Sequence, residues 1–192
     1  MSPNRLPESN LFVPSSPSQA DMPNSALITP NSLPNLQPGR QQKPVGDAYL
    51  RFRLGQQTPA VFSMKHVQEA LILPVHRLTP MPNMPACMLG LMNRRSRVMW
   101  VIDLAQLLGL PVLDTSVRQY SLVIIRVGSI PLGLGVQKIE GIAWLTAESI
   151  QPPPGQAPSS LLPYLRGCVL QQQEISLVLN AEAIVQSSIL HS

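Results

Sequence analysis

The sequence predicts an all-β protein built as a pair of packed barrels. Short segments in which apolar and polar residues alternate recur along residues 47–192, and this alternation is typical of strands with one buried face. Segments with helical spacing are few and short. Residues 47–192 also exceed the length that one small five-stranded barrel requires, so two barrels fit better than one.

The N-terminal residues differ in composition from the rest of the chain. Nine of the 21 prolines fall in residues 1–46, where Asn, Ser and Gln recur without a hydrophobic period. Proline at this density blocks both helix and sheet, and a polar segment of this kind buries too little apolar surface to fold. We therefore predict a disordered Pro/Ser/Asn-rich tail over residues 1–46 and a folded domain over residues 47–192.

The folded part opens with a predicted hairpin. Apolar residues alternate with polar or aromatic ones over residues 49–54, and a second alternating run covers residues 60–64 after a turn at residues 55–58. Residues 67–71 carry apolar side chains at helical spacing, which fits either a short turn of helix or a bent strand.

The middle of the chain predicts a rigid loop, a short helix and two strands. The proline-rich run Thr79–Pro85 predicts the loop, and a short helix is expected through Cys87–Leu91. Val98–Ile102 reads as a strand. Gln119–Val127 is apolar on both faces, which is typical of a central strand.

A short capped helix is predicted directly after the strand Val98–Ile102. Asp103 and Gln106 have the spacing of a capping box, in which the first side chain accepts from the backbone N–H three residues on. Gly109 fits the position just past the end of a helix. The predicted helix is Leu104–Leu108.

The last third of the chain predicts more strands and a closing helix. Four strands are expected, over Leu132–Val136, Ile139–Leu145, Leu165–Leu170 and Glu174–Leu179. Asn180 is expected to cap the closing helix, whose stripe is Ala181, Ile184, Val185, Ser188 and Ile189. The sequence shows no internal repeat.

Side chains suited to catalysis or to metal binding are not gathered in the sequence. His66 and His76 have no acid or cysteine at ligand spacing, so we expect no metal site. Cys87 and Cys168 lie outside any C-x-x-C pair and are expected to be inert, buried or half-buried thiols. Gly133-Leu134-Gly135 lacks the third glycine and the helix of a phosphate-binding loop, so these glycines are expected to allow close backbone approach or a bend of the barrel. The sequence predicts no cofactor and no enzyme activity.

One short basic cluster interrupts a weakly charged sequence. The net charge is +4, and only 12% of the residues are charged. Arg94, Arg95 and Arg97 fit a solvated turn, or an arginine paired with a carboxylate at a partner surface. A nucleic-acid-binding β-barrel module that uses Arg94–Arg97 with Trp100 is the alternative function. Nucleic-acid binders usually have a denser basic stripe, so we expect no nucleic-acid partner.

Membrane-spanning and secretory segments are not predicted. The apolar runs are far shorter than the roughly 20 residues that a membrane helix needs. The N-terminus is polar and proline-rich, unlike a signal peptide. We expect a cytoplasmic protein without direct membrane insertion.

Eight segments follow one another in an order that is specific for one family. They are Tyr49–Gly55, Val67–Glu69, Pro80–Pro85, Gly90–Ser96, Val101–Leu104, Gly135–Val136, Ile150–Pro154 and Tyr164–Gly167. Gly90–Ser96 is similar to the signature G-x-x-N-x-R-G, and Val101–Leu104 to the V-x-D-L that follows it. Over about residues 47–190 the chain resembles CheW, the adaptor of bacterial chemosensory arrays.

The resemblance implies a fold of two intertwined five-stranded SH3-like barrels and a non-enzymatic role. One surface would bind the SH3-like regulatory domain of a CheA-type histidine kinase. A groove between the barrels would take the helical hairpin tip of a methyl-accepting chemoreceptor, at membrane-associated arrays. Within the family, a detached kinase regulatory domain of the same fold is the alternative.

The resemblance also implies which residues bind partners. By position, Met64, Val67 and Val136 are candidates to line the groove, with plain core packing as the alternative for each. Glu69 and Arg95 match the functional acid and arginine of the family and are candidates to pair with each other. Asn93, in the signature segment, completes the set of partner-binding candidates.

Three positions depart from the family pattern. Ser96 replaces a usual glycine, which is costly if the position needs a positive φ. Gln137 replaces an acid and puts any charge pair there in doubt. Trp100 replaces a common proline, and in this respect the chain resembles CheW-like proteins of cyanobacterial pilus-motility and phototaxis systems.

Overall fold

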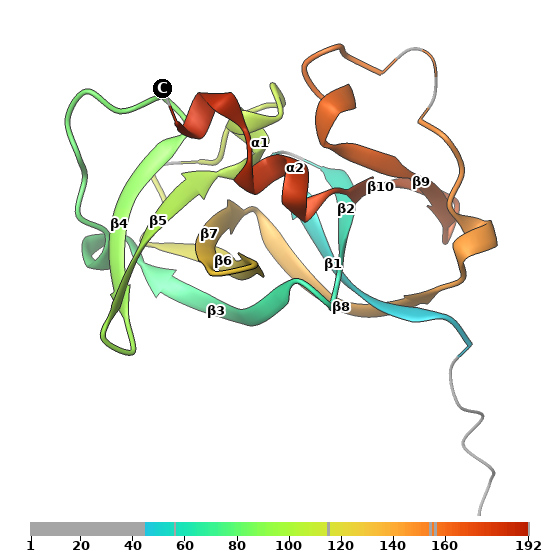
Figure 1. Cartoon of the computed structure of the whole chain (residues 1–192), viewed down its shortest axis with the longest axis horizontal. Helices are drawn as coiled ribbons and strands as arrows, with labels where there is room; N and C mark the ends of the chain where they lie inside the picture. The colour runs from blue at the N-terminus through green and yellow to red at the C-terminus, as the bar shows by residue number, and fades with distance from the viewer. Residues whose placement is uncertain (1–44, 56, 115, 154, 156, 192) are drawn as a thin grey trace, which may run out of the picture. The chain divides into compact units, whose positions relative to one another are not determined.

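The described part of the protein contains ten strands in two five-stranded sheets. The computed structural model describes residues 45–191 except residues 56, 115, 154 and 156. The strand order is β8-β1-β2-β10-β9 in one sheet and β3-β6-β7-β5-β4 in the other (Figure 1). The all-β prediction with two five-stranded units is confirmed. The tail predicted over residues 1–46 lies outside the described residues, apart from its last two.

The two sheets are drawn from strands far apart in the sequence. The first sheet consists of β1 (Asp47–Leu54), β2 (Thr58–Ser63), β8 (Lys138–Leu145), β9 (Leu165–Gln171) and β10 (Glu174–Leu179). The second consists of β3 (Val67–Pro74), β4 (Met88–Arg94), β5 (Arg97–Asp103), β6 (Gln119–Val127) and β7 (Ile130–Val136). The helices are α1 (Leu104–Leu107), α2 (Ala181–Val185), η1 (Val75–Arg77), η2 (Ala147–Ser149), η3 (Leu162–Tyr164) and η4 (Ser188–Leu190).

Each sheet closes into a barrel because a residue that follows one edge strand, β8 or β3, bonds to the strand at the opposite edge, β9 or β4. In the first sheet, Gln151 exchanges two backbone hydrogen bonds of 2.8 Å with Cys168 on β9. In the second, Thr79 exchanges hydrogen bonds of 2.8 and 2.9 Å with Leu91 on β4. Closure satisfies the edge strands, which would otherwise leave unpaired backbone groups. We call the closed units barrel A (β8-β1-β2-β10-β9) and barrel B (β3-β6-β7-β5-β4).

The barrels are interlocked because each takes a hairpin from the other half of the chain. The hairpin β1–β2 completes barrel A with strands β8 to β10, and the hairpin β6–β7 completes barrel B with strands β3 to β5. In both barrels the hairpin joins the remaining strands on one side through a parallel pair, β2 with β10 and β7 with β5, and on the other side through an antiparallel pair, β1 with β8 and β6 with β3. The strand pairing therefore repeats, although the sequence does not.

The repeat extends to irregular features of the strands. One extra residue bulges from the edge strand beside each hairpin, Glu140 in β8 and Gln68 in β3. The turns β9–β10 and β4–β5 each contain two non-glycine residues with positive φ. Asn180 and Asp103 cap the helices that follow β10 and β5. Corresponding positions of the two barrels can thus be compared residue by residue.

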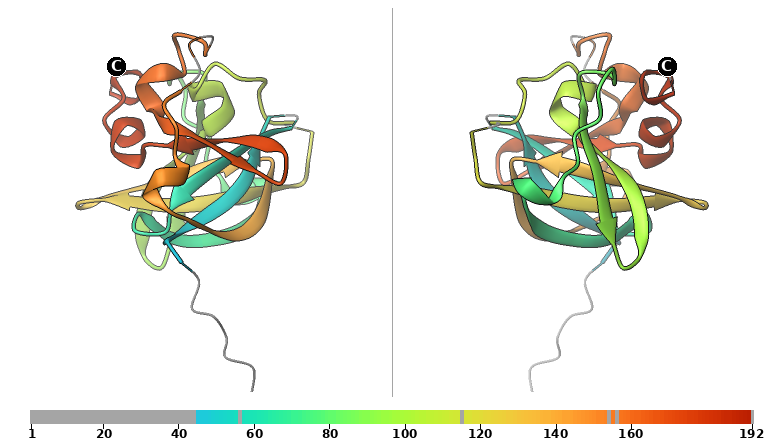
Figure 2. Two further views of the ribbon diagram at one scale, coloured as in Figure 1. Left: turned by 90° about the vertical axis from the view of Figure 1, so that its right-hand side faces the viewer. Right: turned by 90° about the vertical axis from the view of Figure 1, so that its left-hand side faces the viewer.

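The hydrophobic core is divided among the two barrel interiors and the space between them. The largest cluster lies between the barrels and includes Phe52, Phe62, Ile125 and Leu134, and both α1 and α2 pack on it. The rings of Phe52 and Phe62 stack with their centroids 5.3 Å apart. Smaller clusters fill barrel B and barrel A. The views in Figure 2 show α1 and α2 lying over the same end of the described domain.

Most sequence predictions for single elements are confirmed, and two are wrong. The strand Gln119–Val127 has the predicted bounds, and Asp103 accepts a hydrogen bond from Gln106 N at 3.2 Å as the capping box predicted. The segment Cys87–Leu91 is not a helix, because from Met88 onward it pairs with β5 as strand β4. The closing helix is shorter than its apolar stripe, since α2 ends at Val185.

The segment after residue 66 is the bent strand rather than a turn of helix. Its backbone pairs with β6 over the whole of β3, so inter-strand bonds outweigh the helical spacing of its apolar residues. Both cysteines are buried and free, as predicted. A Cβ on Gly133 would lie 3.0 Å from the Val101 side chain, which confirms the close approach expected there.

Candidate partner-binding surface

A bulge in β3 directs Glu69 to the mouth of barrel B. Val67 pairs with Ile125 and Glu69 with Ile124, so Gln68 is the extra residue between them. Ile125 belongs to the core between the barrels, and Ile124 belongs to the interior of barrel B. Val67 accordingly packs against the core between the barrels, while Glu69 lies at the interior of barrel B. A bulge of this kind re-aims the side chains that flank it.

The β4–β5 hairpin supplies arginines to the same place. Arg94 ends β4 opposite Arg97, the first residue of β5. Arg95 and Ser96 form the two-residue turn between them, with φ angles of 52° and 62°. Two successive positive φ angles are typical of a type I′ hairpin turn, for which Asn-Gly is preferred. Ser96 therefore occupies a conformation that glycine adopts at lower cost.

Glu69 is held chiefly by Arg94, with Arg95 as an outer partner. Nη2 of Arg94 donates to Oε1 of Glu69, and Nε of Arg94 donates to Oε2 at 3.4 Å. Nη2 of Arg95 lies 3.8 Å from the same Oε1, on a side chain that is 79% exposed. The hydrogen bond from Arg94 lowers the pKa of the Glu69 carboxyl and raises the pKa of Arg94. The expected Glu69–Arg95 pair is present, but the sequence did not identify Arg94 as the principal partner.

These side chains border a cavity at the mouth of barrel B. Its volume is about 380 Å³, and Met99 and Ile124 from the interior of barrel B form part of its wall. The polar side chains that line it are Gln68, Glu69, Arg94, Arg95, Arg97 and Arg126. We call this cavity the arginine pocket. The described residues that line it carry four cationic groups and one carboxylate, so this part of the surface is electropositive.

Sequence reasoning missed Arg126 as a member of this pocket. Arg126 lies on β6 and its Nε is buried without a hydrogen-bond partner. One signal was available: an arginine near the end of a strand that is otherwise apolar on both faces. An ionisable side chain at such a position needs a partner, because burial of an unpaired charge is costly.

The apolar candidates lie beside this charged site, at the seam between the barrels. Met64 follows β2, and its backbone N–H donates to the Ala48 carbonyl at 2.9 Å. Met64 and Val67 are both partly buried and pack against the core between the barrels. Val67 is separated from Glu69 only by the bulged residue. The seam thus offers apolar surface next to an ion-pair cluster.

Two other candidates have different environments. Val136 ends β7 and is 1% exposed within the core between the barrels, so the core-packing alternative holds for it and its side chain offers no accessible contact surface. Asn93 is exposed on β4, opposite Val98 on β5. The partner-binding candidates that stay at the surface are Met64, Val67, Glu69, Asn93 and Arg95.

The tryptophan considered for nucleic-acid binding does not accompany the arginines. Trp100 packs against the core between the barrels, whereas Met99, its neighbour on β5, lines the arginine pocket. Successive residues of a strand face opposite sides, which separates the ring from the guanidinium groups. Single-strand binding sites combine basic grooves with aromatic stacking platforms. The geometry therefore offers no support for the nucleic-acid alternative.

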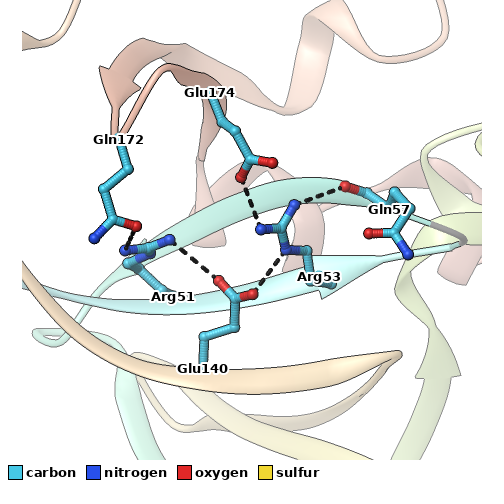
Figure 3. A network of polar contacts seen from close by, with 6 residues as sticks. All are labelled: Arg51, Arg53, Gln57, Glu140, Gln172 and Glu174. Carbon is cyan, nitrogen blue, oxygen red and sulfur yellow. Dashed lines mark hydrogen bonds and ion pairs between the residues drawn. The ribbon is translucent and has the colours of Figure 1, made fainter.

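A second polar network occupies the mouth of barrel A. Arg53 Nε donates to Glu140 Oε1 and Arg53 Nη2 donates to Glu174 Oε2, both at 2.7 Å. Arg51 also contacts Glu140 at 3.3 Å and Gln172 at 3.3 Å (Figure 3). The hydrogen bond from Arg53 lowers the pKa of the Glu140 carboxyl. Charges at this mouth are balanced within the chain.

Two general features of the described residues bear on function. Among them, no group of three His, Cys, Asp or Glu side chains is arranged to hold a metal ion. None of the helices in the described ranges has the length and hydropathy that crossing a membrane requires.

Comparison with known sequences decides the family. The sequence profile of the CheW-like domain matches residues 48–188, nearly the whole described part of the chain. The chain belongs to the CheW-like family. A probable chemotaxis protein CheW of Rhizobium etli is 32% identical over 106 residues, which is 55% of this chain and 68% of that protein. The chemotaxis protein CheW of Rhizobium meliloti is 28% identical over 109 residues, covering 57% of this chain and 70% of that protein.

A solved structure has the same CheW fold. The crystal structure of the scaffolding protein TtCheW from Thermoanaerobacter tengcongensis superposes with a TM-score of 0.62 at 19% identity. The match covers 72% of this chain and 90% of that chain. At this identity the likeness establishes the fold, and it agrees with the interlocked barrels described above.

Proposed function

We propose that this CheW-like chain is a non-enzymatic adaptor that couples methyl-accepting chemoreceptors to a CheA-type histidine kinase. Residues 47–192 are the CheW-like domain in this proposal. The adaptor acts in the cytoplasm, at membrane-associated receptor arrays that it reaches through its partners. The output is control of chemotaxis, phototaxis or type IV pilus motility.

The observation that carries this proposal is the pairing of an apolar seam with a charged cluster in a member of the CheW-like family. Met64 and Val67 are partly buried at the seam between the barrels, and Glu69 holds Arg94 and Arg95 beside it. An apolar surface of this kind suits an amphipathic helix, whose anchors supply affinity. The neighbouring charges supply orientation and selectivity more than affinity.

The role of Glu69 in this site is to position arginines. Its carboxylate contacts both side chains of the turn region, Arg94 by two hydrogen bonds and Arg95 by an ion pair of 3.8 Å. Exposed ion pairs contribute about 0–1 kcal/mol to stability, so the arrangement is worth little to folding. Its consequence is expected in binding.

The proposal is tested by NMR with the isotopically labelled full chain. One titration adds the purified regulatory domain of a CheA-type kinase from the same organism, and a second adds the helical hairpin tip of a chemoreceptor. We expect saturable shifts in both titrations, at two separate patches. The receptor patch is expected to include Met64, Val67 and Arg95, and the kinase patch to lie elsewhere on the barrels.

Two variants probe the two parts of the receptor site. Val67→Lys places a charge on the apolar seam, and Arg95→Glu reverses the exposed turn charge; each is expected to weaken receptor binding about tenfold or more. Arg118→Glu makes the same charge change at an exposed arginine outside the site and serves as the control. Unchanged circular dichroism and melting establish that the variants fold. Absence of saturable shifts with both proteins would exclude the adaptor function.

A further inference from the structure

The two barrels place an arginine at corresponding positions of their mouths. Arg53 is the residue of β1 that pairs with Pro59 on β2, and Arg126 is the residue of β6 that pairs with Pro131 on β7. Each directly follows the residue that pairs next to the bulge: Phe52 pairs with Ile139 in β8, and Ile125 pairs with Val67 in β3. The strand pairing therefore makes Arg53 and Arg126 equivalent.

In barrel A the chain supplies carboxylates to its own arginine. Nε of Arg53 donates to Glu140, the bulged residue of β8, and Nη2 of Arg53 donates to Glu174, the first residue of β10, both at 2.7 Å (Figure 3). The guanidinium is thereby bonded to two carboxylates on two different strands. Its side chain is 18% exposed, so the charge is largely covered as well as paired.

In barrel B the same two positions hold no carboxylate. The bulged residue of β3 is Gln68, the counterpart of Glu140, and the first residue of β5 is Arg97, the counterpart of Glu174. Nε of Arg126 is buried without a partner among the described residues, whereas the same atom of Arg53 is bonded. A buried donor without a partner loses the full free energy of its hydration.

The acid among the described residues that line the pocket does not compensate for this difference. Glu69 lines the arginine pocket, but its oxygens are taken by Arg94 and Arg95. Among the described residues, neither Arg97 nor Arg126 has a carboxylate within ion-pair distance. The pocket of about 380 Å³ therefore combines unpaired guanidinium groups with room for a ligand group.

We propose that the arginine pocket binds a carboxylate from an acidic side chain of a docked protein, in the place that Glu140 and Glu174 fill in barrel A. Guanidinium groups match a carboxylate in geometry as well as in charge, because two parallel N–H donors meet two oxygens. Because the carboxylate is assigned to a docked protein, this proposal rests on the proposed adaptor function. The charge pattern itself does not depend on that function.

The composition of the pocket favours a protein side chain over a nucleic acid. Among the described residues, its walls contain Met99, Ile124 and Pro131 but no aromatic ring on which a base could stack. The apolar walls suit the methylene stem of a glutamate that inserts its carboxylate toward Arg126. The mouth adjoins the seam at Val67, so a protein that binds the seam can reach the pocket.

The test uses the isotopically labelled full chain and disodium glutarate, which carries the carboxylate and methylene groups of a glutamate side chain. Glutarate is titrated against sodium chloride at matched ionic strength, and the Nε–Hε signal of Arg126 is followed by NMR. We expect a saturable shift of that signal and of the backbone amides of residues 94–97. No saturable shift beyond the chloride reference, or a shift centred on Arg53, would overturn the proposal.

A matched variant supplies the missing carboxylate from within the chain. Gln68→Glu keeps the size of the side chain and restores the acid found at the corresponding position of barrel A. An internal carboxylate acts at high effective concentration and competes with the ligand. Glutarate is therefore expected to bind Gln68→Glu at least about fivefold more weakly than the parent chain. Arg118→Gln, which removes an exposed arginine just before the start of β6, is expected to leave glutarate binding unchanged. Equal binding by the parent and Gln68→Glu would contradict the proposed position of the ligand.

Titration with the receptor tip separates this inference from the proposed function. If the tip binds the parent chain, Gln68→Glu is expected to weaken that complex, while Arg118→Gln leaves it unchanged. Equal affinity of the parent and Gln68→Glu for the tip would leave the adaptor function standing and overturn the assignment of the ligand to a docked side chain. If neither protein partner binds the parent chain, the adaptor function fails, and the glutarate titration alone decides whether the pocket binds a carboxylate.

Discussion

Arg53 and Glu140 join strand β1 to the edge strand β8 through a hydrogen bond of 2.7 Å between Nε and Oε1. Glu140 reaches this position because it is the extra residue of a bulge opposite Arg51 and Phe52. The same guanidinium binds Glu174 on β10, so one side chain connects three strands of barrel A. The pairing has consequences for stability, for its dependence on pH and for the interpretation of barrel B.

Replacement of Arg53 by methionine is expected to destabilise the protein. The substitution keeps an apolar stem but removes the hydrogen bonds to Glu140 and Glu174. Hydrogen bonds to charged groups contribute more than neutral ones, and solvent screening reduces the gain, so we expect a loss of about 1–2 kcal/mol. Urea unfolding measures the loss. Arg118→Met is the control, and equal unfolding midpoints for the two variants would contradict the prediction.

Stability is expected to fall as the Glu140 carboxyl becomes protonated. Arg53 holds the pKa of Glu140 below its usual value, so the folded state binds the proton less readily than the unfolded state. The resulting stabilisation is present above the unfolded pKa and is lost as the pH falls through the lower folded pKa. Glu140→Gln should be less stable than the parent at neutral pH, and the difference should shrink below about pH 4. Urea midpoints at several pH values test this; a difference that is constant with pH would contradict it.

Substitution of Ser96 by glycine is expected to stabilise the β4–β5 hairpin. Ser96 has a φ of 62° and Gln173, its counterpart in barrel A, has a φ of 68°. Glycine removes the Cβ strain of the left-handed region but adds entropy to the unfolded chain, so a net gain of roughly 0.5–1 kcal/mol is expected. Gln173→Gly should give a similar gain, because the two turns share one geometry. Thermal unfolding measures both, and a lower melting temperature for Ser96→Gly would contradict the interpretation of the turn.

Substitution of Gly90 by alanine is expected to open barrel B. A Cβ at Gly90 would lie 2.5 Å from the Thr79 carbonyl oxygen, and the residue has a φ of 136°. Thr79 forms the closing hydrogen bonds with Leu91, so the clash acts directly on barrel closure. We expect a loss of roughly 3 kcal/mol. Gly155→Ala, where a Cβ would meet nothing within 4 Å, should be nearly neutral; equal effects of the two substitutions in urea unfolding would argue against the steric explanation.

Both cysteines are expected to react slowly in the folded protein. Burial raises the pKa of the Cys87 thiol and of the Cys168 thiol, and the thiolate is the reactive form. We expect N-ethylmaleimide to modify them at least about tenfold more slowly in the native protein than in urea. Mass spectrometry over time provides the measurement. Rapid modification of either thiol under native conditions would show that its part of the core opens easily.

Prediction from sequence succeeded where the relevant residues are close together in the chain. The strand Gln119–Val127 was predicted from its own apolar composition, and the cap of α1 from the spacing of Asp103 and Gln106. Prediction failed at Cys87–Leu91, where pairing with β5 decides the conformation. Local spacing carries no information about that strand partner.

The candidate site was predictable only in part, for the same reason. The family resemblance led to Glu69 and Arg95, and the pair exists at 3.8 Å. It also led to Val136, which the core between the barrels buries. Arg94 and Arg126 could not be placed at the site from the sequence, because their proximity to Glu69 depends on how β3, β4 and β6 are arranged within barrel B.

The sequence by itself determined most of the strands and the helix caps, because hydrophobic period and capping depend on residues a few positions apart. It also determined the CheW-like family, through motifs in a specific order. Only the tertiary structure decided that Arg53 meets Glu174, which is 121 positions away, while Arg126 meets no carboxylate among the described residues. The physical reason is that charge pairing follows distance in space, and in two interlocked barrels that distance is decided by strand pairing between the halves of the chain.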